Sequence, residues 1–285
     1  MYLTGFRFPS ADKEFDYILS VKRTCYDSYY PFQILGRNDP IELRFEPITF
    51  LYGGNGSGKS TALNVIAEEL NLERDTLFNN SSFFDDYVKL CSCDVTFDLP
   101  KESRIITSDD VFDYMINMRM LNDGISARRE ELFADYLNAK YAGFRLESID
   151  DYEQLKRVNL ARSRTQSKYV KKNLMLHVRG HSNGESAIKY FTDKIGESSL
   201  YLLDEPENSL SPEKQLDLMQ LIDNAARFYG CQFVIATHSP FLLSMRGAKI
   251  YDLDDEPIGI KKWTELPNVK IYHDFFARYS SAFEL

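Results

Sequence analysis

The sequence predicts an α/β protein with a mostly parallel core sheet, N-terminal antiparallel strands and an inserted helical lobe. Three observations lead to this prediction. An apolar run at Ile48–Tyr52 enters a glycine-rich loop, which a helical pattern follows. Two further apolar runs, Leu200–Glu205 and Gln232–Ala236, alternate with a helical pattern in the last third of the chain. A long section with helical periodicity, from about residue 108 to 173, separates these two α/β portions.

Composition and charge limit the possible classes of protein. The 285 residues are 44% hydrophobic and 27% charged, which suits one globular chain with a full core. The formal net charge of −9 excludes a general polyanion-binding coat, so contact with nucleic acid would need a local basic patch. Neither a signal peptide nor a membrane-length apolar stretch is visible, and we expect a cytoplasmic protein that does not insert into membranes.

The N-terminal part has two candidate strands before the glycine-rich loop. Asp16–Arg23 and Ile41–Phe45 alternate apolar and polar residues, which predicts half-buried strands. Ile48–Tyr52 is continuously apolar and predicts a buried strand. A helix is expected over Lys59–Leu70, because its apolar residues recur at helical spacing.

The helical section predicts the domain organisation. Residues 1–107 and 176–285 would form the two parts of one core, and residues 108–175 an inserted helical lobe. Five residues of the lobe are predicted to form one apolar face: Leu132, Phe133, Tyr136, Leu137 and Tyr141.

The C-terminal part predicts a strand, a helix and another strand. Leu200–Glu205 is the first strand. Ser211 is the expected N-cap of the helix, with Pro212 in its first turn, and Gly230 is expected to end it. Gln232–Ser239 supplies the next strand and its loop.

The four cysteines predict buried thiols rather than a metal site. Cys91 and Cys93 are the only close pair, and their one-residue gap does not match the spacing of zinc ligands. Reduced thiols are typical of a cytoplasmic compartment.

A phosphate-binding loop is the strongest motif. The stretch GGNGSGKS, residues 53–60, matches G-x-x-x-x-G-K-[ST] at every position, between a predicted strand and a predicted helix. Glycines let backbone N–H groups surround phosphate oxygens; Lys59 would reach the β- and γ-phosphates, and the Ser60 hydroxyl a Mg²⁺ ion. The alternative is a merely flexible glycine loop. The residues expected to contact ATP are Gly53, Asn55, Gly56, Ser57, Gly58, Lys59, Ser60 and Thr61.

An acidic pair follows the strand at Leu200. Asp204 would hold Mg²⁺ and Glu205 would polarise a water in line with the γ-phosphate. The alternative is that the pair caps the following helix. His238 follows the next strand; a lone histidine there is often structural, but its loop would join the other two at one sheet edge. We therefore expect His238 to contact the γ-phosphate.

The ordered set GGNGSGKST, SNGES, YLLDEPENSLS and ATHSP resembles the ABC-type ATPase superfamily. Within it, the chain is similar to small soluble "AAA family" predicted ATPases related to the SMC and RecF-like group. The similarity is specific in the last hundred residues and loose between Leu72 and Lys172. It implies a P-loop NTPase fold of the ABC-ATPase head type, with Glu205, His238 and Lys59 as catalytic residues.

The resemblance also implies a composite site and an ATP-dependent homodimer. Ser182, Gly184 and Glu185 would belong to the signature that grips the γ-phosphate of the other protomer. Asn183 stands where the commoner signature has a glycine, and asparagine tolerates the left-handed turn. Ser209–Ser211 would be the D-loop, with serine where aspartate is usual. Without the flanking motifs, SNGES would be only a polar turn and N-cap.

Two expected features are less well defined. No glutamine marks a Q-loop, and Ile106–Phe112 is the candidate region. The aromatic residue that stacks on adenine stays open among Tyr17, Tyr29, Tyr30 and Phe32.

The segment Lys156–Asn173 carries seven cations and no acid. It predicts a surface for nucleic acid or a partner protein, switched by ATP. A solvated helical face, or cations that line the γ-phosphate side of a dimer, are the alternatives.

These observations together favour a soluble ABC-type ATPase that uses ATP and Mg²⁺ and acts on nucleic acid or a partner, in genome maintenance or anti-phage defence. The alternatives are the nucleotide-binding subunit of an ABC transporter and a P-loop kinase, which would leave Glu205, His238 and SNGES unexplained. The stretch after the histidine, 240–285, is too short for a nuclease domain, so we expect any nuclease to be a separate chain.

Overall fold

The computed structural model describes residues 1–22, 25–36, 41–141, 156, 158–160, 163, 166, 170, 183–208 and 210–283. The chain divides into two compact units. One unit contains Met1–Phe112 and Asn183–Leu285, and the other contains Asp113–Ser182.

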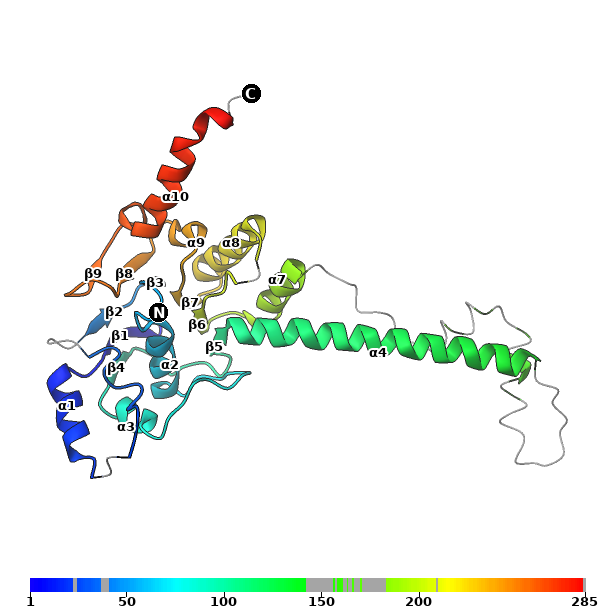
Figure 1. The fold of residues 1–285 in the computed structure, drawn as a ribbon, viewed down its shortest axis with the longest axis horizontal. Helices are drawn as coiled ribbons and strands as arrows, with labels where there is room; N and C mark the ends of the chain where they lie inside the picture. Colours follow the sequence, from blue (N-terminus) through cyan, green and yellow to red (C-terminus); the bar gives the residue numbers. More distant parts are fainter. Residues whose placement is uncertain are drawn as a thin grey trace. The chain divides into compact units, whose positions relative to one another are not determined.

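The first unit contains a six-stranded sheet in the order β5-β6-β7-β3-β8-β9 (Figure 1). Neighbouring strands are parallel from β5 to β8, and β9 is antiparallel to β8. This confirms the predicted mostly parallel core. The strands are β3 (Ile48–Tyr52), β5 (Arg104–Thr107), β6 (Leu200–Asp204), β7 (Gln232–Ala236), β8 (Lys249–Asp252) and β9 (Gly259–Ile260).

A three-stranded antiparallel sheet, in the order β2-β1-β4, confirms the predicted N-terminal antiparallel strands. It comprises β1 (Leu3–Arg7), β2 (Glu42–Arg44) and β4 (Ser92–Val95). The Gln232 side chain joins this sheet to β7. Its oxygen accepts from the N–H groups of Tyr2 (2.8 Å) and Leu3 (2.9 Å), and its amide nitrogen donates to the Leu3 carbonyl (2.6 Å).

The predicted strand at Asp16–Arg23 is wrong, because helix α1 (Ala11–Ser20) occupies most of that stretch. Ser10 caps the helix by accepting a hydrogen bond from the Lys13 N–H. The inward face is set by Glu14, which is only 2% exposed and accepts from the Gln33 N–H (2.6 Å). Glu14 is the buried residue of this helix, whereas the apolar Phe15 and Leu19 are 59% and 67% exposed, so the buried face does not follow the apolar residues of the sequence.

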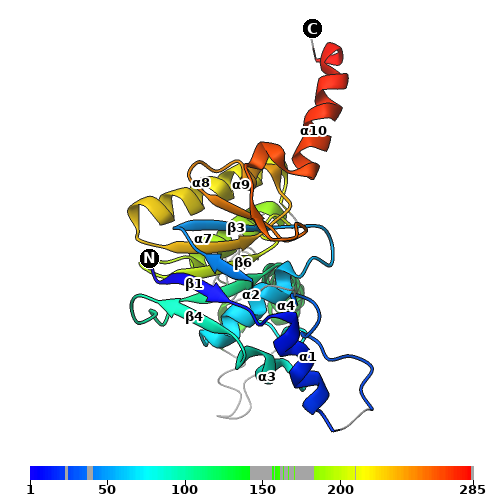
Figure 2. The ribbon, with the colours of Figure 1, turned by 90° about the vertical axis from the view of Figure 1, so that its left-hand side faces the viewer.

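Helices cover both faces of the six-stranded sheet (Figures 1 and 2). α2 (Lys59–Glu69) lies on one face, beside α3 (Phe84–Val88); α8 (Pro212–Phe228) and α9 (Pro240–Leu243) lie on the other. The predicted Ser211 N-cap is confirmed, since its side chain accepts from the Lys214 N–H. Gly230 follows α8 with φ of +67°, which confirms the predicted helix end.

Alternate residues of the buried strands pack into the core on the α2 side. Leu51, Leu202 and Val234 belong to this cluster, together with Leu63 and Ile66 of α2. On the remaining strand positions Tyr201 and Phe233 stack with ring centroids 5.5 Å apart. Burial on both faces explains why these strands are continuously apolar.

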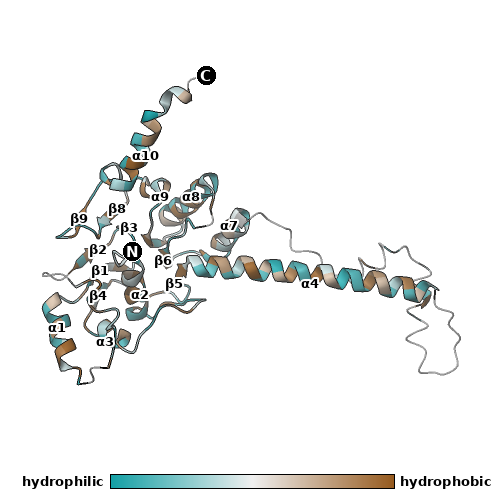
Figure 3. Cartoon of the chain, in the orientation of Figure 1, coloured by the Kyte–Doolittle hydropathy of each residue, from teal (hydrophilic) through white to brown (hydrophobic). Residues whose placement is uncertain are grey.

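Helix α4 (Ser108–Tyr141) begins in the first unit and supplies most of the described part of the second. Hydrophilic and hydrophobic residues alternate along it (Figure 3). Leu132 and Tyr136 are buried with Val170, as the predicted apolar face requires. Leu137 and Tyr141 are 46% and 77% exposed, so this face is narrower than predicted.

Most of the basic segment lies outside the described residues. Of its seven cations only Lys156 is described. Among the helices that the structure describes, none has both the length and the apolar character that crossing a bilayer requires.

Candidate functional site

The predicted phosphate loop connects β3 to α2, as its motif requires. Gly56 and Gly58 have φ of +83° and +91°, a left-handed conformation that other residues rarely adopt. Lys59 is only 5% exposed, and its ammonium group donates to the carbonyl oxygens of Gly53 (2.9 Å) and Gly54 (3.0 Å). Burial lowers the pKa of Lys59, an effect that Glu205 and Asp204 oppose. The Lys59 side chain therefore bridges two carbonyl groups of the loop that is expected to bind the nucleotide phosphates.

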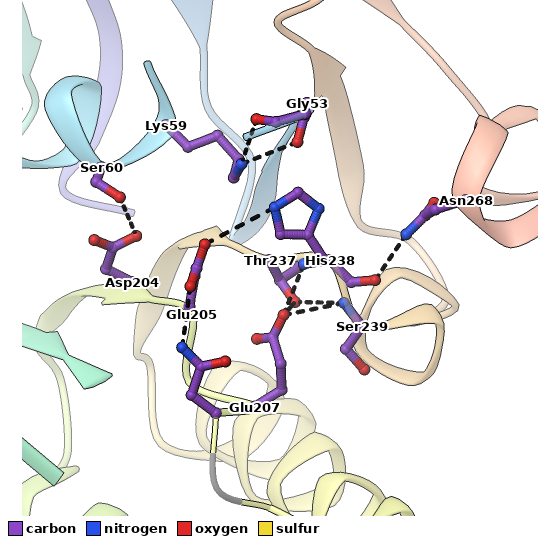
Figure 4. A network of polar contacts seen from close by, with 12 residues as sticks. Gly53, Lys59, Ser60, Asp204, Glu205, Glu207, Thr237, His238, Ser239 and Asn268 are labelled. Atoms are coloured by element: carbon purple, nitrogen blue, oxygen red, sulfur yellow. Dashed lines mark hydrogen bonds and ion pairs between the residues drawn. The ribbon is translucent and has the colours of Figure 1, made fainter. Parts of the chain in front are cut away.

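The strand order brings the three predicted motif loops to one sheet edge. β6, β7 and β3 are parallel neighbours, with Asp204 opposite Ala236 and Ala236 opposite Leu51. The loops after these strands consequently emerge side by side, and Figure 4 shows Asp204, Glu205 and His238 around Lys59.

Ser60 and Asp204 form a pair of oxygen groups that could hold a cation. The Ser60 Oγ donates to Asp204 Oδ1 at 3.0 Å. Burial raises the pKa of Asp204 to about 6, while the hydrogen bond from Ser60 opposes that rise. A hydroxyl and a carboxylate side by side suit Mg²⁺, which prefers oxygen ligands and usually keeps waters and phosphate oxygens as its other ligands. In the described residues no group of three or more His, Cys, Asp or Glu side chains forms a metal site.

Glu205 and His238 face each other beside the phosphate loop. Glu205 Oε1 lies 3.8 Å from His238 Nε2, and the other carboxylate oxygen accepts from Asn208 Nδ2 at 3.0 Å. Glu205 has a left-handed φ of +46°, and its N–H donates to the Ala236 carbonyl (2.9 Å). Burial lowers the pKa of His238, and the charge of Lys59 adds to this effect. The ring is therefore neutral at neutral pH.

Two cavities adjoin these residues. One, of about 250 Å³, is lined by the phosphate loop and Glu205, and its lining residues are Ile34, Asn55, Gly56, Gly58, Lys59, Ser60, Thr61 and Glu205. The other, of about 620 Å³, lies between the Glu205–His238 pair and helix α10 (Pro267–Arg278). The lining of the smaller cavity suits phosphate groups, because Gly56, Gly58, Lys59 and Ser60 are the residue types with which a phosphate loop binds phosphate oxygens.

The four candidate aromatic residues for adenine differ in their contacts. Tyr17 and Phe32 stack on each other at 4.5 Å. Tyr29 packs against Phe83, with ring centroids 5.0 Å apart. Tyr30 lies closest to the loop, with its hydroxyl 3.2 Å from the Thr61 hydroxyl.

The described part of the predicted signature starts helix α7 (Asn183–Lys194). Gly184 and Glu185 lie in its first turn, whereas Ser182 lies outside the described residues, as does Ser209 of the predicted D-loop. The residues that line the phosphate-loop cavity include none from α7. The predicted Q-loop region, Ile106–Phe112, contains the end of β5 and the start of α4, where Asp110 accepts from the Thr107 N–H (2.6 Å).

Sequence reasoning missed four residues that support the site. Asp254 accepts from the Gly54 N–H (2.6 Å), and Asn208 holds Glu205. Glu207 and Asn268 contact the loop of His238. Glu207 and Asn208 directly follow the acidic motif, so their proximity was a usable signal. Asp254 and Asn268 belong to no motif.

A phosphate loop after a buried parallel strand, beside a carboxylate at the end of a second strand, defines a P-loop nucleotide-binding domain. Comparison with known families narrows the class. A family model described as "ABC transporter" matches residues 38–208, and one described as "AAA domain, putative AbiEii toxin, Type IV TA system" matches residues 185–244. The first covers more than half of the chain. The chain therefore belongs to the ABC-type ATPase superfamily, as the motifs predicted.

Solved structures of ABC proteins overlap with the chain at low similarity. "Dimeric structure of a post-hydrolysis state of the ATP-binding cassette MJ0796 bound to ADP and Pi" has 16% identity and a TM-score of 0.35, covering 74% of this chain and 84% of that one. "An inward-facing conformation of a putative metal-chelate type ABC transporter" has 16% identity and a TM-score of 0.36, covering 80% and 77%. No curated protein matches the chain.

Proposed function

We propose that this ABC-type ATPase binds Mg·ATP, closes into a dimer that sandwiches two ATP molecules, and uses hydrolysis to drive a conformational cycle. The observation that carries the proposal is the convergence of Lys59, Asp204, Glu205 and His238 at one sheet edge (Figure 4). The alternative of a P-loop kinase accounts for Lys59 but leaves the facing pair of Glu205 and His238 unexplained.

Each residue has a role that follows from its place. Lys59 binds the β- and γ-phosphates beside the loop N–H groups. Ser60 and Asp204 would hold Mg²⁺, which when bound would neutralise charge on the phosphate oxygens. Glu205 accepts a proton from the attacking water, whose oxygen bonds to the γ-phosphorus while the bond to the β–γ bridging oxygen breaks. Neutral His238 donates a hydrogen bond to a γ-phosphate oxygen.

A dimer is proposed because, among the described residues of the predicted signature, none lines the phosphate-loop cavity of its own chain. Ser182 and Gly184 would approach the γ-phosphate in the partner, with the N-terminus of α7 directed at it. Glu185 lies in the same first turn.

Glu205→Gln is the first test. It should slow hydrolysis by about 10²–10⁴-fold, the usual contribution of a general base, while ATP binding persists. Glu197→Gln, which changes an exposed carboxylate before β6, is the control and should leave the rate unchanged. Light scattering of Glu205→Gln should give a dimer only with Mg·ATP, and adding Ser182→Arg should restore the monomer. A wild-type rate for Glu205→Gln would refute the catalytic assignment.

The target of the cycle is proposed to be nucleic acid or a partner protein, through the basic segment at 156–173. Fluorescence anisotropy with single- and double-stranded DNA and RNA, at several salt concentrations and with or without ATP, tests the first. The "ABC transporter" model that matches residues 38–208 favours a second candidate, a transporter's nucleotide-binding subunit. Nucleic-acid binding that Mg·ATP strengthens would argue against this second candidate.

A further inference from the structure

The peptide of His238 is held from both sides by side chains to which the sequence analysis gave no role. Glu207 Oε1 accepts from the His238 N–H at 2.7 Å. Asn268 Nδ2 donates to the His238 carbonyl at 2.8 Å. Figure 4 shows the two side chains on opposite sides of the histidine backbone. The peptide orientation at His238 is thus fixed independently of any contact that the ring makes.

Glu207 fixes the whole loop. The same carboxylate oxygen also accepts from the Thr237 hydroxyl (2.7 Å) and from the Ser239 N–H (3.1 Å). One carboxylate oxygen that accepts from three donors forms a strong hydrogen-bonded cluster. Since Glu207 stands two residues after Glu205, the turn that carries the general base also holds the loop that carries the histidine.

Asn268 fastens the loop to the C-terminal helix. It lies in the first turn of α10, where Leu266 and Val269 are buried. Its N–H contacts the Tyr52 hydroxyl (3.4 Å), and the Tyr52 ring lies edge-on to His238 at 6.2 Å. The start of α10 is therefore anchored against the site.

The histidine ring has no such anchor. His238 Nε2 is buried and has no hydrogen-bond partner among the described residues, since its distance of 3.8 Å from Glu205 Oε1 is too long for a hydrogen bond. Its position therefore depends on the backbone that carries it. A rotation of that peptide would shift Nε2 relative to Glu205 and to a γ-phosphate.

We propose that Glu207 and Asn268 are positioning residues for ATP hydrolysis, which set the place of the His238 ring by holding the N–H and the C=O of its peptide. The proposal rests on the proposed function of Glu205 and His238. It extends the site to α10, whose first turn becomes part of the hydrolytic machinery.

The test is a double-mutant cycle measured by single-turnover ATP hydrolysis. Asn268→Ala removes the donor, and the nearly isosteric Asn268→Asp removes it without creating a cavity. Each should lower the hydrolysis rate on the order of 10- to 100-fold, as small misplacements of catalytic groups do, with unchanged ATP affinity. Lys270→Ala, an exposed position in the same helix, is the matched control and should keep the wild-type rate.

Repeating the Asn268 substitutions in a His238→Ala variant distinguishes positioning of His238 from a general structural role. In His238→Ala, the Asn268 variants should cause no further loss of rate, because they act through the histidine. Glu207→Gln should behave in the same way, since the neutral amide oxygen holds the three donors less strongly. Equal losses with and without His238 would overturn the proposal, and so would a wild-type rate for Asn268→Asp. A wild-type chain without ATPase activity would instead overturn the proposed function itself.

Discussion

Replacing Gly58 by alanine tests how the phosphate loop is held. Gly58 caps α2 with φ of +91°, and a Cβ there would lie 2.7 Å from Leu35 Cδ2 and 3.1 Å from Ile34 Cγ2. Both contacts belong to the segment that covers the loop, and Leu35 is itself 2% exposed. The added methyl group therefore has to displace a packed side chain as well as adopt a left-handed backbone.

Gly56 separates the two costs. Its φ of +83° is similar, but a Cβ there would meet nothing within 4 Å. A left-handed L-residue costs about 1–2 kcal/mol, so this is the expected loss of unfolding free energy for Gly56→Ala. Gly58→Ala adds overpacking, typically about 1–3 kcal/mol, so its expected loss is roughly 2–5 kcal/mol.

Urea unfolding followed by circular dichroism measures both losses. Leu35→Ala should partly rescue Gly58→Ala, so that the double variant loses less than the sum of the single ones, whereas it should add fully to Gly56→Ala. Equal losses for the two glycine variants, or full additivity of Gly58→Ala with Leu35→Ala, would refute this account of the packing.

Three further predictions concern buried polar groups. Burial raises the pKa of Glu14 above its ordinary 4.5. Protonated Glu14 therefore stabilises the fold at acidic pH, and this contribution is lost as the pH rises through the folded-state pKa. Glu14→Gln should make the urea midpoint depend less on pH and should raise the stability at neutral pH. Gln232→Leu leaves three backbone groups of the β1 edge without partners and should cost at least about 3 kcal/mol by the same assay. Glu205→Gly should abolish hydrolysis but raise the melting temperature, because glycine relieves the backbone strain of about 1 kcal/mol at a φ of +46°. A lower melting temperature would contradict the presence of this strain.

The strands of the core could be predicted because they are buried on both faces. Three of them are short apolar runs bounded by turn residues, a pattern that in an α/β chain is typical of buried strands: Ile48–Tyr52, Leu200–Asp204 and Gln232–Ala236. The N-cap of α8 could also be predicted, because Ser211 and Pro212 adjoin the helical turn that they stabilise. Helix α1 could not be predicted from neighbouring residues in this way. Its inner face is set by Glu14, whose partners Gln33 and Tyr87 lie elsewhere in the sequence.

The same distinction applies to the site. Lys59, Asp204 and Glu205 could be proposed because each directly follows a predicted strand or loop, and neighbouring parallel strands end at one edge. Asn268 could not, because its contact with His238 spans thirty residues and an asparagine in a first helical turn has many other uses.

The electrostatics of the site argue that the nucleotide and the cation bind together. Burial lowers the pKa of Lys59, and four carboxylates, those of Glu205, Asp204, Asp254 and Glu207, oppose this effect, so their negative charges surround the ammonium group that would receive the phosphates. ATP alone would bring its negative phosphates close to these four carboxylates, and Lys59 by itself cannot offset the resulting repulsion. A divalent ion held by Ser60 and Asp204, as proposed, would remove that repulsion at its source. Titration calorimetry should therefore show much weaker ATP binding with a chelator than with Mg²⁺, and Asp204→Asn should narrow this difference. If chelation leaves the affinity unchanged, the carboxylates do not govern the entry of the nucleotide.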